Sequence, residues 1–398
     1  MNLYRPAPAL LLLAATLLFA DHTAFAQMPL PAAPRVGADH YVLMDAATGD
    51  VLVERDAETP VEPASLTKLM TAYVVFKAIE EGRVSLEDMV TISQDAWIAG
   101  GGIVGSRERR NVSTMYAREG SQISVQDLLK GMIIVSGNDA SVALAERVAG
   151  SEAAFADLMN HYAARLGMVN SHFVNSHGLP AEGHISSAGD MARLAQAIIS
   201  GFPDLYAYYS QRRFDWDGTS QPNRNGLLGV RVGGAGTVDG MKTGYTAAAR
   251  YCLVTSAADE RMRLISVIMG SPSVGGRERA SRELLSYGFN NFETHTLYRA
   301  GEEVTRARLW RGREREVALG VAEDVTMLVP RGRRDHLQAD LDLPRLITAP
   351  LPAERPLGQL TVRLEDEALT QVDLYPLEDM PEGSFWQRTR DAVLLWFE

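Results

Sequence analysis

The sequence predicts an α+β protein: an antiparallel sheet with a helical subdomain, then a small all-β domain and a C-terminal amphipathic helix. Strand-like segments near residues 41–54 and 238–269 enclose a long stretch with helical periodicity. Strands on both sides of a block of helices favour this class, with a two-lobed α/β domain as the alternative. The 398 residues, 46% hydrophobic and 22% charged, suffice for two folded domains.

The first 26 residues have the pattern of a secretory signal peptide. Arg5 precedes an apolar run at 7–20, and Ala24-Phe25-Ala26 fits a cleavage site between small residues. We expect residues 1–26 to be removed on export. The alternative is an uncleaved anchor, for which the run is short. Because the chain has one cysteine, Cys252, it has no internal disulfide, and apolar neighbours predict a buried, inert thiol.

The charge of the chain limits its partners. The formal net charge is −11. Binding to the phosphates of nucleic acids requires a basic surface, so we expect no nucleic-acid partner. An anionic substrate must therefore meet a local concentration of positive charge.

Ser65 and Lys68, three residues apart, form the first candidate catalytic element. A serine hydroxyl is a poor nucleophile unless a nearby base takes its proton during attack. Residues three apart on a helix share one face, so both side chains would point the same way. For a solitary Ser-x-x-Lys, a capping serine beside a solvated lysine is the commoner interpretation.

Two further triplets give this pair a chemical context. Ser136-Gly137-Asn138 lies between two predicted helices, and Lys242-Thr243-Gly244 ends a strand-like run. Each triplet is common by itself. All three motifs in this order, each in its expected structural setting, are difficult to obtain by chance.

The residue types supply the parts of an acyl-transfer site. Ser65 would attack, and Lys68 would accept its proton. Lys242 would lower the pKa of Lys68 by like-charge repulsion, aided by partial burial. Ser136 would relay a proton to the leaving amine, and Asn138 would hold Lys68 and a substrate amide.

The same argument predicts an oxyanion hole. Its donors would be the backbone N–H groups of Ser65 and Tyr245. The residue before the second donor is Gly244, which permits a close approach of the backbone.

The three motifs resemble those of penicillin-binding proteins and serine β-lactamases. Over nearly the whole mature chain, the sequence is most similar to the low-molecular-mass penicillin-binding proteins that are D-alanyl-D-alanine carboxypeptidases, peptidase family S11. This resemblance implies a serine β-lactamase/penicillin-binding transpeptidase-like fold for residues 27–295. It implies removal of the terminal D-Ala from peptidoglycan stem pentapeptides through an acyl-enzyme on Ser65. It also implies covalent inhibition by β-lactams and neither a cofactor nor a metal.

The resemblance further implies a substrate-binding set made of Lys242, Thr243, Gly244, Tyr245 and Arg277. Within this set, Thr243 and Arg277 would anchor the terminal carboxylate of the substrate. For Arg277, an arginine on a helix surface is an equally good interpretation.

Two features depart from the family pattern. Ala247 and Arg250 stand where Asp and Gly are more common. The Gly-rich loop at 98–120, which carries three arginines (Arg107, Arg109 and Arg110), is longer than usual and is predicted to be mobile beside the site, or else an ordinary solvated loop. These departures bear on deacylation rate and substrate preference.

Three alternatives to a carboxypeptidase stay open: a serine β-lactamase, a DD-endopeptidase, and a catalytically weak penicillin-sensing or wall-binding protein. Against a β-lactamase, Gly137 stands where the class A pattern has Asp, and no additional Glu base is evident. Against a weak binding protein, all the motif residues are intact.

The C-terminal part is predicted to have no catalytic role. Residues 296–383 contain short alternating segments interrupted by prolines, which predicts a β-rich domain. In residues 384–398 the aromatic side chains, including Trp386, Trp396 and Phe397, share one side of a helix. This pattern predicts a helix that lies in the membrane interface. With the family resemblance, it implies a location at the periplasmic face of the bacterial inner membrane. The alternative is a helix docked on its own domain or on a dimer partner.

Overall fold

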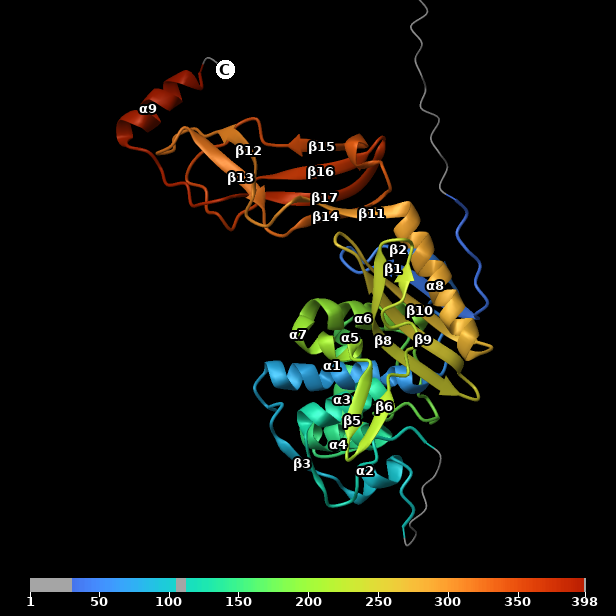
Figure 1. Cartoon of the computed structure of the whole chain (residues 1–398). Coiled ribbons are helices and arrows are strands. Elements are labelled where there is room, and N and C mark those ends of the chain that lie inside the picture. The colour runs from blue at the N-terminus through green and yellow to red at the C-terminus, as the bar shows by residue number, and fades with distance from the viewer. Residues whose placement is uncertain (1–30, 105–111, 397–398) are drawn as a thin grey trace, which may run out of the picture. The chain divides into compact units, whose positions relative to one another are not determined.

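The computed structural model describes residues 31–104 and 112–396. The predicted signal peptide, the three loop arginines and Phe397 lie outside these residues. The described chain has the predicted α+β class (Figure 1). An antiparallel sheet with helices is followed by a strand-rich part and a last short helix.

The first domain is built on a six-stranded sheet whose order is β2-β1-β10-β9-β8-β7. All its neighbouring strands are antiparallel. Strand β1 of the hairpin near the start of the chain therefore pairs with β10, more than 200 residues later, as the predicted helical insertion requires. The strands are β1 (His40–Asp45), β2 (Val51–Arg55), β7 (Arg231–Val232), β8 (Gly236–Thr246), β9 (Arg250–Ala258) and β10 (Arg263–Ser271).

Both faces of this sheet are covered. In β1, Val42 and Met44 join the core under the helical subdomain, whereas Tyr41 and Leu43 join the core under α8 (Val274–Asn291). Alternate side chains of a strand point to opposite faces, so a strand between two layers is apolar throughout. This explains why the central strands are continuous hydrophobic runs.

The helical subdomain surrounds α1 (Thr67–Glu80), which is buried on most of its circumference. A helix buried on all sides needs apolar or small residues all round, as this one has. A 3₁₀ turn (Ala64–Leu66) precedes it and carries Ser65, so Ser65 lies just before the helix that carries Lys68. The other elements of this part are β3 (Met89–Thr91), α2 (Gln94–Ala99), β4 (Gln122–Ser124), α3 (Val125–Val135), α4 (Asn138–Ala149), α5 (Glu152–Arg165), α6 (Ala188–Gly201), α7 (Pro203–Tyr206), β5 (Arg213–Trp216) and β6 (Thr219–Pro222).

The C-terminal part is a β domain with its own core. Its five-stranded sheet has the order β12-β13-β17-β16-β15, and β11 pairs with β14. The predicted boundary at residue 296 falls inside β11, which begins directly after α8. The strands are β11 (Phe292–Tyr298), β12 (Glu303–Arg308), β13 (Glu316–Val321), β14 (Val325–Pro330), β15 (Leu337–Asp342), β16 (Gly358–Leu364) and β17 (Glu367–Pro376).

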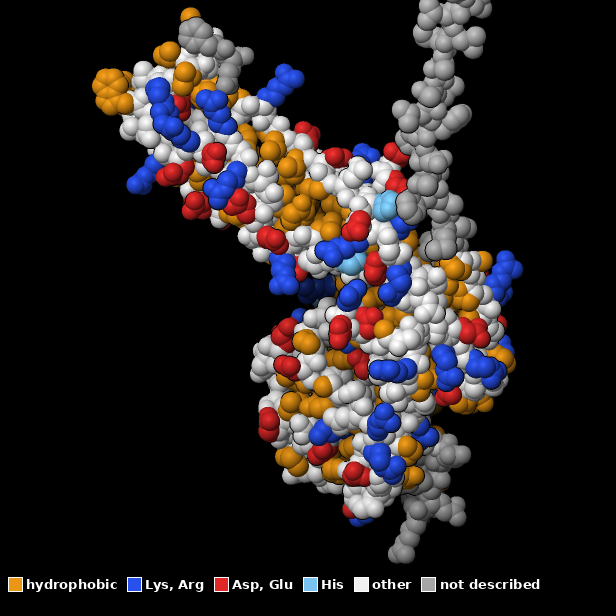
Figure 2. All heavy atoms as spheres, turned by 45° about the horizontal axis from the view of Figure 1, so that its top comes forward, with side chains coloured by type: hydrophobic (Ala, Val, Ile, Leu, Met, Phe, Trp, Pro, Cys, Tyr) orange, Lys and Arg blue, Asp and Glu red, His pale blue; other side chains and the backbone are white. Residues whose placement is uncertain are grey.

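Helix α9 (Phe385–Leu394) follows this domain. Ser384 and Gln387 form a capping box that fixes its first turn. Trp386 is 80% exposed, whereas Asp391 is buried and accepts a hydrogen bond from the backbone N–H of Arg311. Apolar side chains at the end of α9 lie on the surface of the β domain's far tip in Figure 2. Among the described helices, none combines the length and apolar character that crossing a bilayer requires.

Candidate active site

Three segments distant in sequence bring the predicted catalytic residues together. Lys68 Nζ lies 3.1 Å from Ser65 Oγ and 2.8 Å from Asn138 Oδ1. Lys242 Nζ lies 2.9 Å from Ser136 Oγ. The first group joins α1 to α4, and the second joins β8 to the end of α3.

The hydrogen bonds of Lys68 define which partner can exchange a proton with it. Besides Ser65 and Asn138, its amine bonds the backbone oxygen of His177 at 2.6 Å. The two carbonyl oxygens can only accept. In a neutral amine the two N–H groups therefore go to these carbonyls, and the lone pair is left for the hydroxyl proton of Ser65. This is the arrangement a general base needs.

Burial makes the neutral amine accessible. Lys68 is 1% exposed, and burial lowers its pKa to about 7, although the charges of Asp139 and Glu152 act in the opposite direction. From the sequence, repulsion from Lys242 is expected to lower the pKa of Lys68, aided by partial burial. In the structure, complete burial is the main cause.

Repulsion between the two lysines acts on Lys242. Burial lowers the pKa of this lysine well below its ordinary value, and the charges of Lys68, Arg277 and Arg224 lower it further, in that order. Its partner Ser136 caps α3 with φ of 65°, in the left-handed region that residues with a Cβ seldom adopt. The turn places this hydroxyl beside Lys242.

The end of β8 lies against the turn that holds the nucleophile. A Cβ on Gly244 would lie 3.2 Å from the backbone oxygen of Pro63 and 3.3 Å from the Leu66 nitrogen, tighter than ordinary contact. Glycine thus allows the approach that the predicted oxyanion hole requires. On its outer side, β8 pairs with β7 only through Gly236 and Thr237. Within the described residues, its later part has no neighbouring strand there.

Arg277 is not on a helix surface, so that interpretation was wrong. It is 7% exposed, and its Nη1 donates to the backbone oxygens of Gly244 at 3.1 Å and Cys252 at 3.2 Å. The guanidinium therefore ties α8 to the ends of β8 and β9. Thr243 is 8% exposed, whereas Tyr245 is 57% exposed and its ring packs at a tilt against Tyr251, with 4.5 Å between the ring centroids.

Arg250 stands where Gly is more common in the family, and its backbone conformation shows why glycine suits this position. Its φ is 57°, a backbone conformation that favours glycine. Its side chain forms an ion pair with Asp39 at 2.8 Å. Buried Cys252, two residues later, has its pKa raised to about 11 by burial, which suits an inert thiol.

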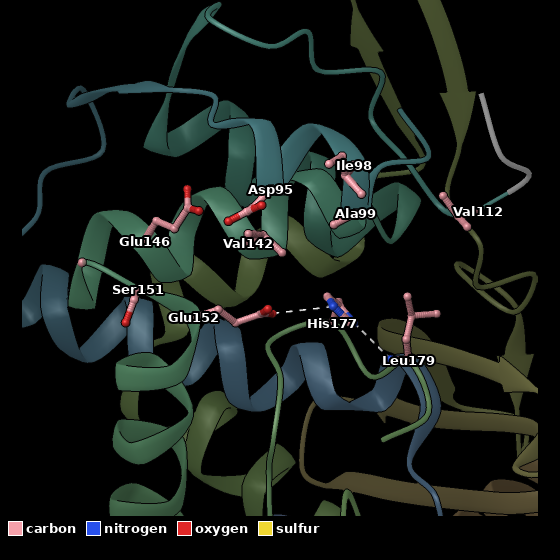
Figure 3. A pocket seen from close by; sticks show the side chains of 11 residues that line it. Asp95, Ile98, Ala99, Val112, Val142, Glu146, Ser151, Glu152, His177 and Leu179 are labelled. Carbon is pink, nitrogen blue, oxygen red and sulfur yellow. Dashed lines mark hydrogen bonds and ion pairs between the residues drawn. The ribbon is translucent and has the colours of Figure 1, made fainter. Parts of the chain in front are cut away.

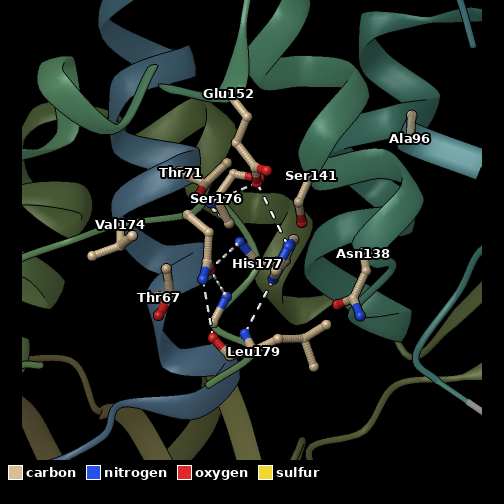
Figure 4. A network of polar contacts seen from close by, with 12 residues as sticks. Thr67, Thr71, Ala96, Asn138, Ser141, Glu152, Val174, Ser176, His177 and Leu179 are labelled. Atoms are coloured by element: carbon tan, nitrogen blue, oxygen red, sulfur yellow. Dashed lines mark hydrogen bonds and ion pairs between the residues drawn. The ribbon is translucent and has the colours of Figure 1, made fainter. Parts of the chain in front are cut away.

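Two buried or partly buried acidic residues hold the loops around the site by hydrogen bonds, and the sequence motifs do not predict them. The loop that supplies the His177 oxygen is held by Glu152, which accepts from the Ser176 backbone N–H at 2.9 Å and from its hydroxyl at 2.6 Å (Figure 4). Asp139 is buried and accepts from the backbone N–H groups of Met115 and Ala117. Neither residue belongs to a motif or a periodic pattern, so only the folded chain reveals these contacts.

A cavity of about 540 Å³ adjoins this loop. Figure 3 shows Glu152 and His177, which line the cavity, directed toward one another, and Asp95 and Glu146 on the helices beside them. Burial raises the pKa of Glu146, and the charges of Asp95 and Glu152 add to this. The cavity is therefore acidic, in contrast to the cationic site next to it.

The fold and the site define a class of protein. A helical subdomain on an antiparallel sheet, a serine nucleophile in a turn before a buried helix, and a buried lysine base describe an active-site serine enzyme for acyl transfer.

Comparisons with known proteins identify the family. The Peptidase_S11 model, described as D-alanyl-D-alanine carboxypeptidase, matches residues 27–273, and the penicillin-binding protein 5 C-terminal domain model matches residues 292–382. The D-alanyl-D-alanine carboxypeptidase DacC of Escherichia coli is 43% identical over 377 residues, covering 94% of this chain and 92% of the relative. DacA of the same species is 40% identical over 369 residues, covering 92% and 90%.

A solved structure shows the same fold. Penicillin-binding protein 5 from Haemophilus influenzae matches with a TM-score of 0.81 and 38% identity, over 88% of this chain and all of that one. The chain therefore belongs to the D-alanyl-D-alanine carboxypeptidase family of serine peptidases. The predicted fold class and family are confirmed.

Proposed function

We propose that this enzyme removes the terminal D-Ala from peptidoglycan stem pentapeptides through an acyl-enzyme on Ser65, and that β-lactams acylate the same serine. The observation that carries this proposal is the contact of 3.1 Å between Ser65 Oγ and the buried amine of Lys68. It pairs a nucleophile with a base whose pKa is about 7.

Acylation follows from the contacts of these residues. Neutral Lys68 takes the hydroxyl proton as Ser65 Oγ attacks the carbonyl carbon of the penultimate D-Ala. The oxyanion is stabilised by the backbone N–H groups of Ser65 and Tyr245. As the peptide bond breaks, Ser136 passes a proton to the leaving amine. Lys68 gives up the proton that it took from Ser65 in this step and is neutral again. The products are free D-Ala and an ester on Ser65.

Deacylation repeats this chemistry with water. A water molecule gives a proton to Lys68 as it attacks the ester, and Ser65 recovers its proton when the ester breaks. The same base serves both steps because each begins from a neutral amine. A β-lactam forms the same ester, but its amine stays tethered to the acyl group.

The substrate is proposed to lie along the outer edge of β8. Edge strands offer unpaired N–H and C=O groups to an extended peptide. The cations Lys242 and Arg277 provide the local positive charge that an anionic terminus needs on a chain of net charge −11. Thr243 is the hydroxyl donor for the same carboxylate.

The location of the protein is part of the proposal. We propose that residues 1–26 direct export to the periplasm. We also propose that α9 lies in the interface of the inner membrane on its periplasmic face and anchors the enzyme there. Trp386 and Trp396 are 80% and 91% exposed, and such aromatic side chains are suited to a membrane interface. The buried side of α9 is the polar side at Asp391, contrary to a helix docked by its apolar face.

The experiment is mass spectrometry of the mature protein after penicillin and after a peptide ending in D-Ala-D-Ala. We expect a long-lived penicillin adduct, release of D-Ala, and loss of both in Ser65→Ala. Ser200→Ala, at an exposed serine of α6, is the matched control. Rapid turnover of penicillin would indicate a β-lactamase, and an adduct without D-Ala release would indicate a binding protein. Labelling of the Ser65→Ala variant by penicillin would contradict the assignment of Ser65 as the nucleophile.

A further inference from the structure

The residue before the nucleophile has a strained backbone. Ala64 has a φ of 50°, in the left-handed region that residues with a Cβ seldom adopt. Such a conformation persists only where the surrounding structure holds it. The orientation of this peptide sets the start of the turn that carries Ser65, so whatever fixes Ala64 also fixes the nucleophile.

A directed chain of hydrogen bonds ends on the Ala64 carbonyl. The hydroxyl of Thr67 lies 2.8 Å from the Ala64 oxygen and 2.8 Å from His184 Nε2. His184 Nδ1 lies 2.9 Å from the backbone nitrogen of Val174. Thr67 and Val174 lie on α1 and on the neighbouring loop in Figure 4.

The direction of every bond in this chain is fixed. A backbone N–H can only donate, so His184 Nδ1 accepts from Val174, and the ring proton of the neutral imidazole is on Nε2. His184 therefore donates to Thr67, whose single hydroxyl proton then goes to the Ala64 oxygen. His184 is 2% exposed, and burial lowers its pKa to about 4, so the neutral form is the one present near neutral pH.

Gly178 packs closely against the same Ala64 carbonyl. A Cβ on Gly178, whose φ is 84°, would lie 1.9 Å from the Ala64 oxygen and 2.8 Å from the Thr67 hydroxyl. Gly178 lies in the same loop as His177, whose backbone oxygen accepts a hydrogen bond from Lys68. Nucleophile and base are thus held by one unit.

We infer that His184 is a positioning residue for Ser65, acting through Thr67 on the Ala64 carbonyl. This inference rests on the proposed function, because it concerns the rate at which Ser65 is acylated. His184 touches neither Ser65 nor Lys68 by a hydrogen bond, and its effect is on the geometry of attack. Misplacement of reacting groups by a fraction of an ångström to 1 Å costs up to about 100-fold in rate.

The test measures the acylation rate constant with a fluorescent penicillin, per active site, together with the melting temperature. His184→Leu and Thr67→Val each remove the chain, and we expect acylation to slow by roughly 10-fold to 100-fold. Thr67→Ser keeps the hydroxyl, and His184→Gln keeps a donor toward Thr67. We expect both to acylate within about threefold of the unaltered enzyme, whatever their melting temperatures.

The double variant His184→Leu/Thr67→Val decides whether the residues act as one unit. We expect it to be no slower than the slower single variant. Multiplicative losses, or single variants that acylate at the unaltered rate, would overturn the inference. If His184→Leu does not fold, Thr67→Val against Thr67→Ser remains a near-isosteric test. Failure of the proposed function is distinguishable, because the unaltered enzyme would then release no D-Ala from the peptide, whereas the inference is tested by differences in acylation rate among the variants.

Discussion

The active site and helix α9 break the usual distribution of side chains in opposite ways. Lys68 and Lys242 are 1% and 2% exposed, although lysine side chains are rarely buried. Trp386 and Trp396 are 80% and 91% exposed, although large aromatic side chains are normally covered. The same chain thus buries two amines at the active site and exposes apolar surface at α9.

The difference shows where each unfavourable placement is useful. Removing an amine from water lowers its pKa, which creates a base. Exposing an aromatic face leaves apolar area in contact with water. Covering this area with another apolar phase, such as a membrane, lowers the free energy. Neither placement stabilises the isolated fold, and in each region the surrounding residues are hydrogen-bonded: Asn138 at the first, Asp391 at the second.

The largest expected effect is at the buried lysine. Lys68→Met should reduce acylation by penicillin on the order of 1,000-fold, since loss of a general base costs 10²–10⁴ in typical cases. Lys77→Met, on the same helix but near solvent and paired with Glu80, is the matched control and should change the rate less than about twofold. Stopped-flow or gel-based labelling gives the rates. Equal reductions of the acylation rate in the two variants would contradict the role of buried Lys68 as the general base.

The next effect concerns the exposed aromatic face. Trp386→Glu/Trp396→Glu should reduce co-sedimentation with lipid vesicles by about tenfold or more, because it places charge on the apolar face. Val169→Glu, at an 84% exposed apolar residue elsewhere, is the control and should bind as before. Acylation should be unaffected in both. Unchanged sedimentation of the double variant would remove the membrane role of α9.

The smallest expected effect is at the turn after β8. Arg250→Gly and Arg250→Ala both lose the ion pair with Asp39, so their difference reports the backbone alone. The glycine variant should be the more stable by about 1 kcal/mol, because φ of 57° strains alanine. Thermal or urea unfolding measures this difference. An alanine variant of equal or greater stability would show that the turn is not strained.

Much of the fold could be predicted because it follows from local patterns. The strand-like segments and their order relative to the helical stretch predict the sheet and its helical insertion. The three motifs identify the candidate catalytic residues because acyl transfer needs a limited set of side-chain types. The amphipathic pattern likewise predicts the exposed aromatic side of α9.

The remainder depends on contacts between distant segments. No local pattern indicates that burial, more than Lys242, lowers the pKa of Lys68. The buried position of Arg277 requires α8 to pack across β8 and β9. The bond between His184 and Thr67 joins residues 117 positions apart, so only the folded chain can show it.

The pH dependence of Ser65 acylation tests the central claim most directly, that buried Lys68 acts as the neutral base. Its folded pKa is lowered to about 7, so the reactive form is lost as pH falls through 7. We expect the acylation rate constant to level off above pH 7 and to fall tenfold for each unit below it. A profile that continues to rise toward pH 10, as for an ordinary lysine, would contradict the account, as would one that stays flat between pH 5 and 8.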